Sequence, residues 1–134
     1  MTMTPNEYRP VPPEAIKKQQ AFFQSGASKE LAFRMQQLRQ LERAIDKWEN
    51  ELLRALELDL GKCRQEAYMT EVGLLRAELA YIMKHLPSWV QARKVRTPCL
   101  YPGARSFIYP EPLGQVLIIS PWNYPVYLAL TPLL

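Results

Sequence analysis

The stretch Trp122-Asn123-Tyr124-Pro125 is the strongest candidate in the sequence for a binding or catalytic role. It follows an apolar run, Gln115 to Ile119, that is typical of a buried strand, and it precedes what looks like the start of a helix. In open α/β sheets, ligands bind at this carboxyl end of a strand. The amide of Asn123 could there donate a hydrogen bond to a developing oxyanion. A second interpretation stays open, in which Asn123 caps the following helix and Trp122 fills the core.

Two cysteines and one histidine are the other candidates for chemistry. Cys63 and Cys99 show no activating environment in the sequence, so each is interpreted as structural or incidental. His85 falls in the last turn of an expected helix, where a cation suits the dipole, and is interpreted as structural. Two cysteines give no disulfide framework, so we expect a reduced, cytoplasmic compartment and no metal site.

The helices expected to support these candidate residues lie in a proline-free half of the chain, residues 14–86. A first helix is expected over 14–25, and Ser28 is expected to cap the next one. We expect that second helix to break near Glu49-Asn50 and to end at Gly61. Its apolar stripe has steps of three or four residues and comprises Leu31, Met35, Leu38, Leu41, Ile45, Trp48, Leu52 and Leu56.

Another stripe with helical spacing follows in the same half of the chain. It comprises Tyr68, Val72, Leu75, Leu79, Ile82 and Leu86. Pro87 is expected to end that helix near His85, because proline removes a helical hydrogen bond. The simplest interpretation is that both stripes form a core through which the helices pack on one another. For residues 31–56 the alternative is a contact between subunits of an oligomer.

The second half of the chain is punctuated by proline, with eight of the 12 prolines from Pro87 onward. Residues 94–97 and 106–109 have β character and predict a hairpin or a pair of extended arms. After the expected strand at 115–119 and its loop, residues 126–134 predict the start of a helix. Strand, loop and helix start form the opening of a βαβ unit, whose parallel strand needs a neighbour that does not follow here.

Length and composition exclude several classes of protein. The 134 residues are 48% hydrophobic and 22% charged, as in an ordinary globular domain. No run approaches the roughly 20 apolar residues of a membrane span, and the polar, proline-rich start is no signal peptide. Because the chain ends inside an apolar run, we expect that this end docks on something or that the chain continues in the complete protein.

The net charge of +4 is concentrated in the second half, where residues 79–134 carry five basic residues and one acid. The basic side chains at Arg93, Lys94, Arg96 and Arg105 would suit a hairpin that binds nucleic acid. No nucleic-acid-binding motif accompanies them, so a solvated face is the preferred interpretation and no nucleic-acid partner is expected.

The sequence resembles the aldehyde dehydrogenase superfamily between Glu111 and Pro125, where it reads EPLGQVLIISPWNYP. The family pattern is E-P-[LVI]-G, an apolar strand and then P-W-N-[YF]-P. The resemblance runs from about Phe22 to Leu134 and is closest to the class 3 branch. Segments similar to that branch are Arg34 to Leu41, Asp59 to Lys62, Glu66 to Tyr68, Glu71 to Gly73 and His85 to Trp89.

This resemblance implies an incomplete α/β fold made of N-terminal helices, a β-hairpin and the first strand of a nucleotide-binding domain. It divides the chain into an extended arm, a helical segment packing on that domain, a bridging or oligomerisation hairpin, and the strand, loop and helix start of the dinucleotide-binding domain. The ranges in that order are 1–13, 14–90, 91–113 and 114–134. A homodimer is expected for the complete protein.

The resemblance also implies a reaction. The family oxidises aldehydes to carboxylic acids by hydride transfer to NAD or NADP, with a cysteine thiolate as nucleophile and a glutamate as base. Asn123 would hold the oxyanion of the thiohemiacetal. The positions that match the family's dinucleotide site are Ile119, Ser120, Pro121 and Trp122, and those at the wall of its aldehyde tunnel are Tyr124 and Leu128.

The sequence lacks several functional residues of the family pattern. The nucleophilic cysteine, the base, the ribose-binding lysine and the glycine-rich turn lie downstream in the family, and neither Cys63 nor Cys99 matches the nucleophile. We therefore expect the N-terminal portion of an NAD(P)-dependent enzyme for aliphatic or aromatic aldehydes, inactive as 134 residues alone. The alternative is a stand-alone, non-catalytic helical interaction module.

Overall fold

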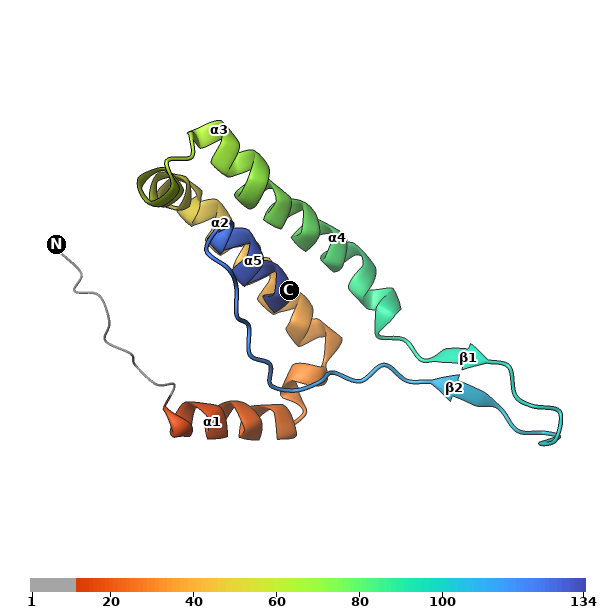
Figure 1. Ribbon diagram of the computed structural model, residues 1–134. Helices are drawn as coiled ribbons and strands as arrows, with labels where there is room; N and C mark the ends of the chain where they lie inside the picture. The colour runs from red at the N-terminus through yellow and green to blue at the C-terminus, as the bar shows by residue number, and fades with distance from the viewer. Residues whose placement is uncertain (1–11) are drawn as a thin grey trace.

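The computed structural model describes residues 12–134, which form two long helices with shorter elements around them (Figure 1). The expected arm at 1–13 falls outside the described residues except for Pro12 and Pro13. In chain order the elements are α1 (Pro13–Gln24), η1 (Ala27–Lys29), α2 (Leu31–Leu60), α3 (Arg64–Ala67), a π-helical turn η2 (Tyr68–Val72), α4 (Gly73–Trp89), β1 (Arg93–Val95), β2 (Ser106–Ile108), α5 (Pro125–Leu130) and η3 (Thr131–Leu133).

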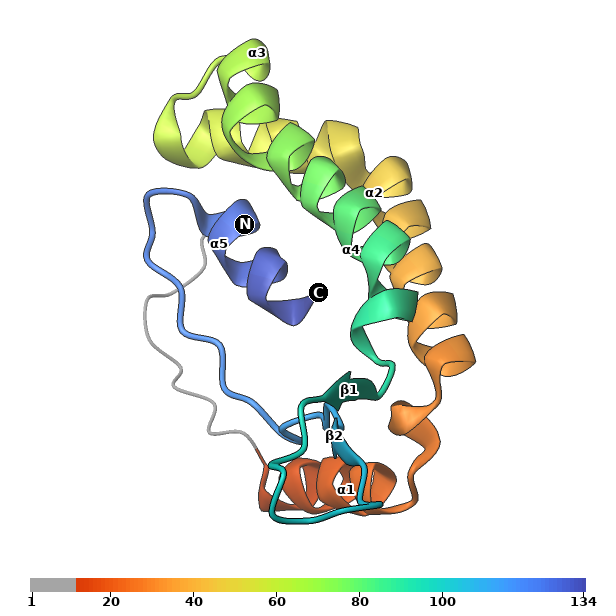
Figure 2. The same ribbon diagram turned by 90° about the vertical axis from the view of Figure 1, so that its right-hand side faces the viewer.

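The core lies between α2 and α4, which run side by side in opposite directions (Figure 2). The two expected apolar stripes supply most of it, because residues three and four apart share one helix face. Its buried side chains are Leu38, Ile45, Leu53, Leu56, Ala67, Val72, Leu75 and Leu79. Trp48 and Tyr68 belong to the expected stripes but are substantially exposed, so the stripes are wider than the buried contact.

The break expected near Glu49-Asn50 is wrong, because α2 continues without interruption to Leu60. Strong helix formers surround the site, and the opposite helix holds it through an ion pair. Arg76 of α4 contacts Asp46 at 2.5 Å and Glu49 at 2.7 Å. Burial lowers the pKa of Arg76, but hydrogen bonds to Glu49 and Asp46 outweigh it and hold the pKa above its ordinary value.

Two expectations about helix ends are also wrong. Ser28 lies inside the short turn η1, and the residue that precedes α2 is Glu30, which makes no side-chain capping bond. Pro87 lies inside α4, which continues to Trp89. Because proline lacks only its own N–H, the last turn closes around it through a bond from Val90 N to Leu86 O at 3.2 Å. The stop at Gly61 is confirmed, with φ of 66° in the left-handed region.

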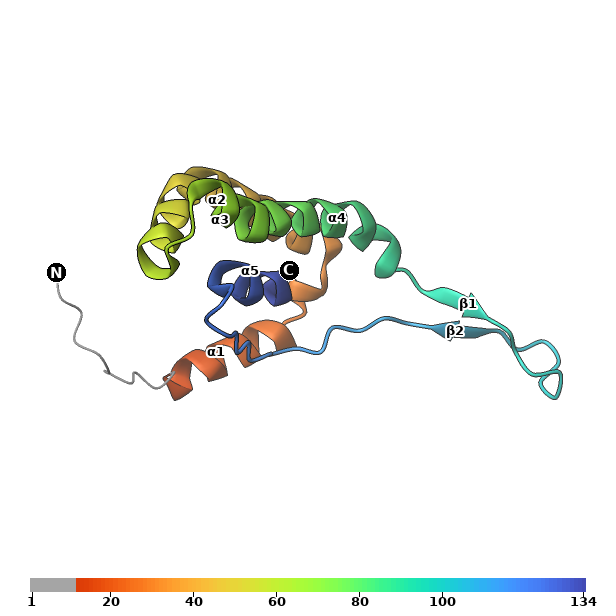
Figure 3. The ribbon, with the colours of Figure 1, turned by 45° about the horizontal axis from the view of Figure 1, so that its top comes forward.

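The expected hairpin is confirmed, as β1 and β2 pair antiparallel with Lys94 opposite Phe107. Thr97 extends this pairing, because its Oγ1 accepts a hydrogen bond from Ser106 N at 3.0 Å. The hairpin projects away from the helices (Figure 3). This two-stranded ribbon is the sheet found among residues 12–134.

The strand expected at 115–119 does not form in the described structure, which leaves residues 109–124 without a helix or a strand. A parallel strand needs a hydrogen-bonded neighbour, and none lies beside it among residues 12–134. Most of its apolar side chains are consequently exposed, Ile119 to 84%, and Ile118 is half-buried. The segment is held against α1 instead, where Gln115 Nε2 donates to Ile16 O at 2.7 Å.

The helix expected from residue 126 is confirmed as α5, with Pro125 at its first position. It lies against η2 and α4, on the inner side of the curved pair of long helices (Figure 2). Val126, Tyr127 and Leu130 pack against the core. The end of the chain is therefore joined to the helical half by side-chain packing.

Candidate functional site

The candidate site lies where the loop before α5 meets the connection between α2 and α4. Gly61 ends α2 and turns the chain so that Lys62 follows it directly. Glu71 lies on the π-helical turn η2, and both side chains are buried, with Glu71 fully inaccessible. π-Helical turns are rare and occur often at functional sites. Two buried charges therefore meet beside the loop that the sequence marks for chemistry.

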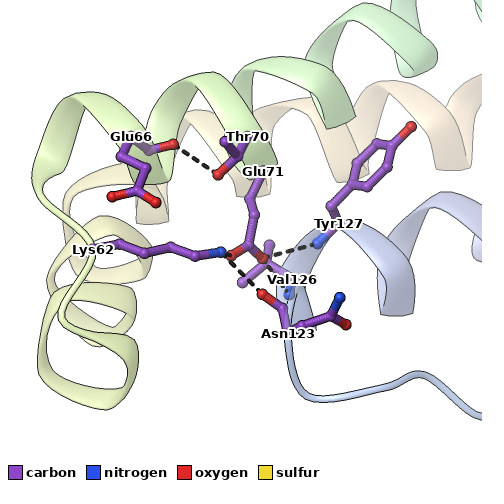
Figure 4. Close-up of polar contacts among 7 residues, drawn as sticks. All are labelled: Lys62, Glu66, Thr70, Glu71, Asn123, Val126 and Tyr127. Atoms are coloured by element: carbon purple, nitrogen blue, oxygen red, sulfur yellow. Dashed lines mark hydrogen bonds and ion pairs between the residues drawn. The ribbon is translucent and has the colours of Figure 1, made fainter.

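Glu71 satisfies both of its carboxylate oxygens across the fold (Figure 4). Oε1 pairs with Lys62 Nζ at 2.6 Å. Oε2 accepts hydrogen bonds from the backbone N–H groups of Val126 at 2.8 Å and Tyr127 at 3.3 Å. Those N–H groups begin α5 and have no partner within their own helix. A buried carboxylate is thus paired with a cation and caps a helix that follows 55 residues later.

Lys62 adds a second attachment to the same loop. Its Nζ donates to the backbone oxygen of Asn123 at 3.1 Å and lies 4.2 Å from the centre of the Tyr124 ring. An ammonium at that distance over an aromatic face is attracted to the ring. The backbone from Asn123 to Tyr127 is therefore held at both ends by one ion pair.

The side chain of Asn123 is left free by this arrangement. It is exposed and makes no hydrogen bond to any residue in the range 12–134, and in Figure 4 its amide points away from Glu71. The interpretation in which Asn123 caps the helix is wrong, because Tyr124 is the capping position and Glu71 supplies the bonds. The interpretation in which Trp122 fills the core is wrong as well, since this side chain is 86% exposed.

Tyr124 and Leu128, which the resemblance assigns to an aldehyde tunnel, line one open and mainly apolar groove. Its volume is about 260 Å³, and it lies between η2 with the start of α4 on one side and α5 on the other. The remaining lining residues are Met69, Thr70, Leu74 and Tyr127. An open apolar groove of this size can hold the hydrocarbon part of a small molecule.

The four positions that the resemblance matches to a dinucleotide site lie just before Asn123, whose backbone oxygen Lys62 holds. Ile119, Pro121 and Trp122 are exposed, and Ser120 is half-buried. Together they offer apolar surface and backbone polar groups, and no positive charge.

Neither cysteine nor His85 takes part in the polar contacts that join Lys62, Glu71 and the loop before α5. Cys63 and Cys99 are free and exposed. The centre of the His85 ring lies 4.3 Å from the centre of the Tyr81 ring and 5.8 Å from that of Trp89, on which it stacks. Residues 12–134 contain no group of three or more His, Cys, Asp or Glu side chains that could hold a metal ion.

Sequence reasoning assigned no role to Lys62 or Glu71. One signal could have found Glu71, because it stands beside Val72 and four residues before Leu75 in an apolar stripe. A charged residue there is expected to be buried and paired. Its partners could not be inferred from spacing, since Lys62 and Val126 come from separate elements.

Comparison with known proteins identifies the family of proteins to which the chain belongs. The sequence pattern of the aldehyde dehydrogenase family matches residues 11–134. The chain belongs to this family. Several of its relatives are members of family 3, in agreement with the resemblance to the class 3 branch.

Three curated relatives show how similar the chain is to individual members of the family. The chain is 41% identical over 114 residues to 4,4'-diaponeurosporen-aldehyde dehydrogenase of Staphylococcus aureus, covering 85% of this chain and 25% of that protein. It is 40% identical over 121 residues to aldehyde dehydrogenase family 3 member A2 of Macaca fascicularis, covering 90% and 25%. The dimeric, NADP-preferring aldehyde dehydrogenase of Canis lupus familiaris is 38% identical over 120 residues, covering 90% and 26%.

The fold agrees with a solved structure of the family. The substrate-bound state of Staphylococcus aureus AldH is similar with a TM-score of 0.89 and 38% identity, covering 93% of this chain and 27% of that one. The expected fold, an incomplete α/β aldehyde dehydrogenase, is thereby confirmed. The chain spans about a quarter of the length of the curated relatives it matches.

Proposed function

We propose that the complete protein carrying this chain oxidises aliphatic or aromatic aldehydes to carboxylic acids with NAD or NADP. Family membership and the names of the relatives support this reaction class. In this proposal the 134 residues supply the oxyanion donor, one wall of the aldehyde tunnel and part of the cofactor site, and have no activity alone.

One observation carries the proposal for Asn123, namely a free, exposed amide on a loop whose backbone is fixed by buried charges. Negative charge develops on the aldehyde oxygen when a nucleophile attacks the carbonyl carbon. A donor that is already oriented stabilises this charge without reorganisation, and removing one such donor costs roughly 10²–10³ in kcat. Asn123 is proposed to donate this hydrogen bond.

The groove is proposed to guide the aldehyde toward Asn123. Tyr124 and Leu128 lie on its α5 side, and Met69 and Leu74 lie opposite. These side chains would bury the hydrocarbon chain of the substrate, which favours aldehydes with apolar tails over small polar ones.

The segment from Ile119 to Trp122 is proposed to contact the dinucleotide. Its exposed apolar side chains fit the flat rings of such a cofactor, and its lack of a basic residue leaves the phosphates to other parts of the protein. A bound NAD or NADP would accept the hydride of the aldehyde. The residues of this chain would orient the cofactor and exclude water from it.

A homodimer and a cytoplasmic location are also proposed. The hairpin range, 91–113, projects from the helices and exposes Phe107, Ile108 and Tyr109, a surface suited to bridging two subunits. The dimeric relative from dog supports this arrangement. None of the helices in the described part combines the length and apolar character needed to span a bilayer.

The experiment is an absorbance assay of NADH and NADPH formation with short, long and aromatic aldehydes, using the complete protein and the 134-residue chain. We expect aldehyde-dependent reduction of one cofactor by the complete protein and none by the chain alone. Reduction by neither preparation would contradict the proposed reaction and would favour a helical interaction module. Reduction by the chain alone would contradict the assignment of its parts.

A further inference from the structure

We propose that Lys62 and Glu71 are a positioning pair, whose role in the reaction is to fix the backbone that aims the Asn123 amide. This inference rests on the proposed function of Asn123 as the oxyanion donor. Neither side chain would touch the substrate, because Glu71 is fully buried and Lys62 nearly so. Both would act through the loop.

The contacts define a clamp with two ends. At one end, Lys62 Nζ holds the Asn123 carbonyl oxygen at 3.1 Å. At the other, Glu71 Oε2 holds the first N–H groups of α5, the nearer at 2.8 Å. The 2.6 Å contact between Lys62 and Glu71 ties the two ends together. The peptide units around Asn123 therefore have little freedom to rotate.

Burying Lys62 and Glu71 costs desolvation free energy, so we infer that the pair is kept for the specific geometry that it maintains. Charged groups removed from water are stabilised only when their hydrogen bonds are well satisfied, and an apolar pair of similar volume often stabilises a fold equally well. Here each contact beyond the ion pair itself is directed to the loop before α5 or to its first turn. The main element contacts of α5 are with η2, α4 and η3, so η2 supplies much of its support.

Positioning of the amide has a clear consequence for rate. An oxyanion donor works only when it is already aimed at the position that the charged oxygen will occupy. A displacement of about 1 Å at a reacting group can cost roughly 10²-fold in rate. The clamp is thus expected to influence kcat. A substitution that keeps a side-chain oxygen at position 71 still holds the first N–H groups of α5, so the groove between η2 and α5, and with it substrate binding, should stay largely intact.

The test is a double-mutant cycle in the complete protein. Glu71→Gln keeps a side-chain oxygen for the N–H groups of α5 and removes the charge that faces Lys62. We expect kcat to fall roughly 10-fold with KM nearly unchanged. In an Asn123→Ala background the same substitution should change kcat less than about twofold, because the amide that the clamp aims is already absent.

A second variant keeps the test valid if a single substitution prevents folding. Lys62→Met/Glu71→Gln removes both charges and leaves no unpaired charge buried, so it should fold even where a single substitution does not. It should show the same loss of kcat and the same dependence on Asn123. The matched control is Arg76→Gln, which breaks an ion pair between α4 and α2 and makes no contact with the loop. The kcat of Arg76→Gln should equal that of the unmodified protein.

The outcomes separate the two proposals. If Asn123→Ala leaves kcat unchanged, the oxyanion role fails and the positioning role fails with it. If Asn123→Ala lowers kcat but the charge-removing variants do not, the positioning role alone is overturned. An equal loss in both backgrounds would overturn it too, since the pair would then act independently of Asn123.

Discussion

The carboxylate of Glu71 accepts a hydrogen bond from the backbone N–H of Val126 at 2.8 Å, which joins the π-helical turn η2 of the first half to the start of α5 in the second. Together with Lys62, this contact makes the geometry around Asn123 depend on side chains that lie far from it in sequence. The helical half of the chain therefore supports the proposed oxyanion site and fixes its geometry.

The buried pair is expected to be sensitive to the loss of one member. Lys62→Met leaves the Glu71 carboxylate buried without its cation, so the free energy of unfolding should fall by about 3–5 kcal/mol. Adding Glu71→Gln should recover a large part of that loss. Thermal or urea unfolding of the complete protein and both variants measures this difference. Equal stability of the single and double variants would contradict the charge argument.

Gly73 is expected to be required by the π-helical turn that carries Glu71. A Cβ at this position would lie 2.9 Å from the backbone oxygen of Tyr68, closer than real contacts allow. Gly73→Ala should therefore shift the turn and cost about 1–3 kcal/mol of stability, as overpacking does. The melting temperature tests this directly. A variant that melts at the same temperature or higher would mean that the turn tolerates a side chain.

The apolar core makes a prediction with a matched control. Leu75 is fully buried between α2 and α4, so Leu75→Ala should cost about 2–5 kcal/mol. Leu58 lies on α2 with 76% of its surface exposed, and Leu58→Ala should cost less than about 0.5 kcal/mol. The two unfolding curves should differ clearly. Similar costs would show that Leu58 is covered by another part of the complete protein.

The local elements could be largely predicted from sequence. Apolar residues three and four apart correctly marked α2 and α4, and Gly61 correctly marked the end of α2. These features depend on neighbours within one element. The same reasoning gave wrong answers at Pro87 and near Glu49-Asn50, where packing and an ion pair between helices outweigh local signals.

The strand and the clamp depend on partners outside their own segment. The apolar run at 115–119 has strand character but no neighbour to pair with among residues 12–134, so it remains irregular. Lys62 and Glu71 could not be assigned a role because their contacts with the second half bridge 61 and 55 residues, respectively. The free state of the Asn123 amide follows from Glu71 taking over the helix cap, which no spacing within the loop indicates.

The groove leads to a prediction about specificity in the complete protein. Leu128→Trp would narrow the space between α5 and η2, so kcat/KM should fall roughly 10-fold or more for long or aromatic aldehydes and less for short ones. Leu58→Trp places the same bulk on an exposed face and should leave specificity unchanged. Equal losses for short and long aldehydes would argue against a substrate wall at Leu128.

Asn123 is proposed to donate a hydrogen bond to the developing oxyanion, and steady-state kinetics of Asn123→Ala in the complete protein measure this role without intermediate steps. The control is Asn50→Ala, which removes an amide of α2 that accepts a bond from Arg64 at 2.6 Å. We expect kcat to fall roughly 10²-fold or more for Asn123→Ala and to be unchanged for Asn50→Ala. If kcat of Asn123→Ala equals that of the unmodified protein, Asn123 is not the oxyanion donor.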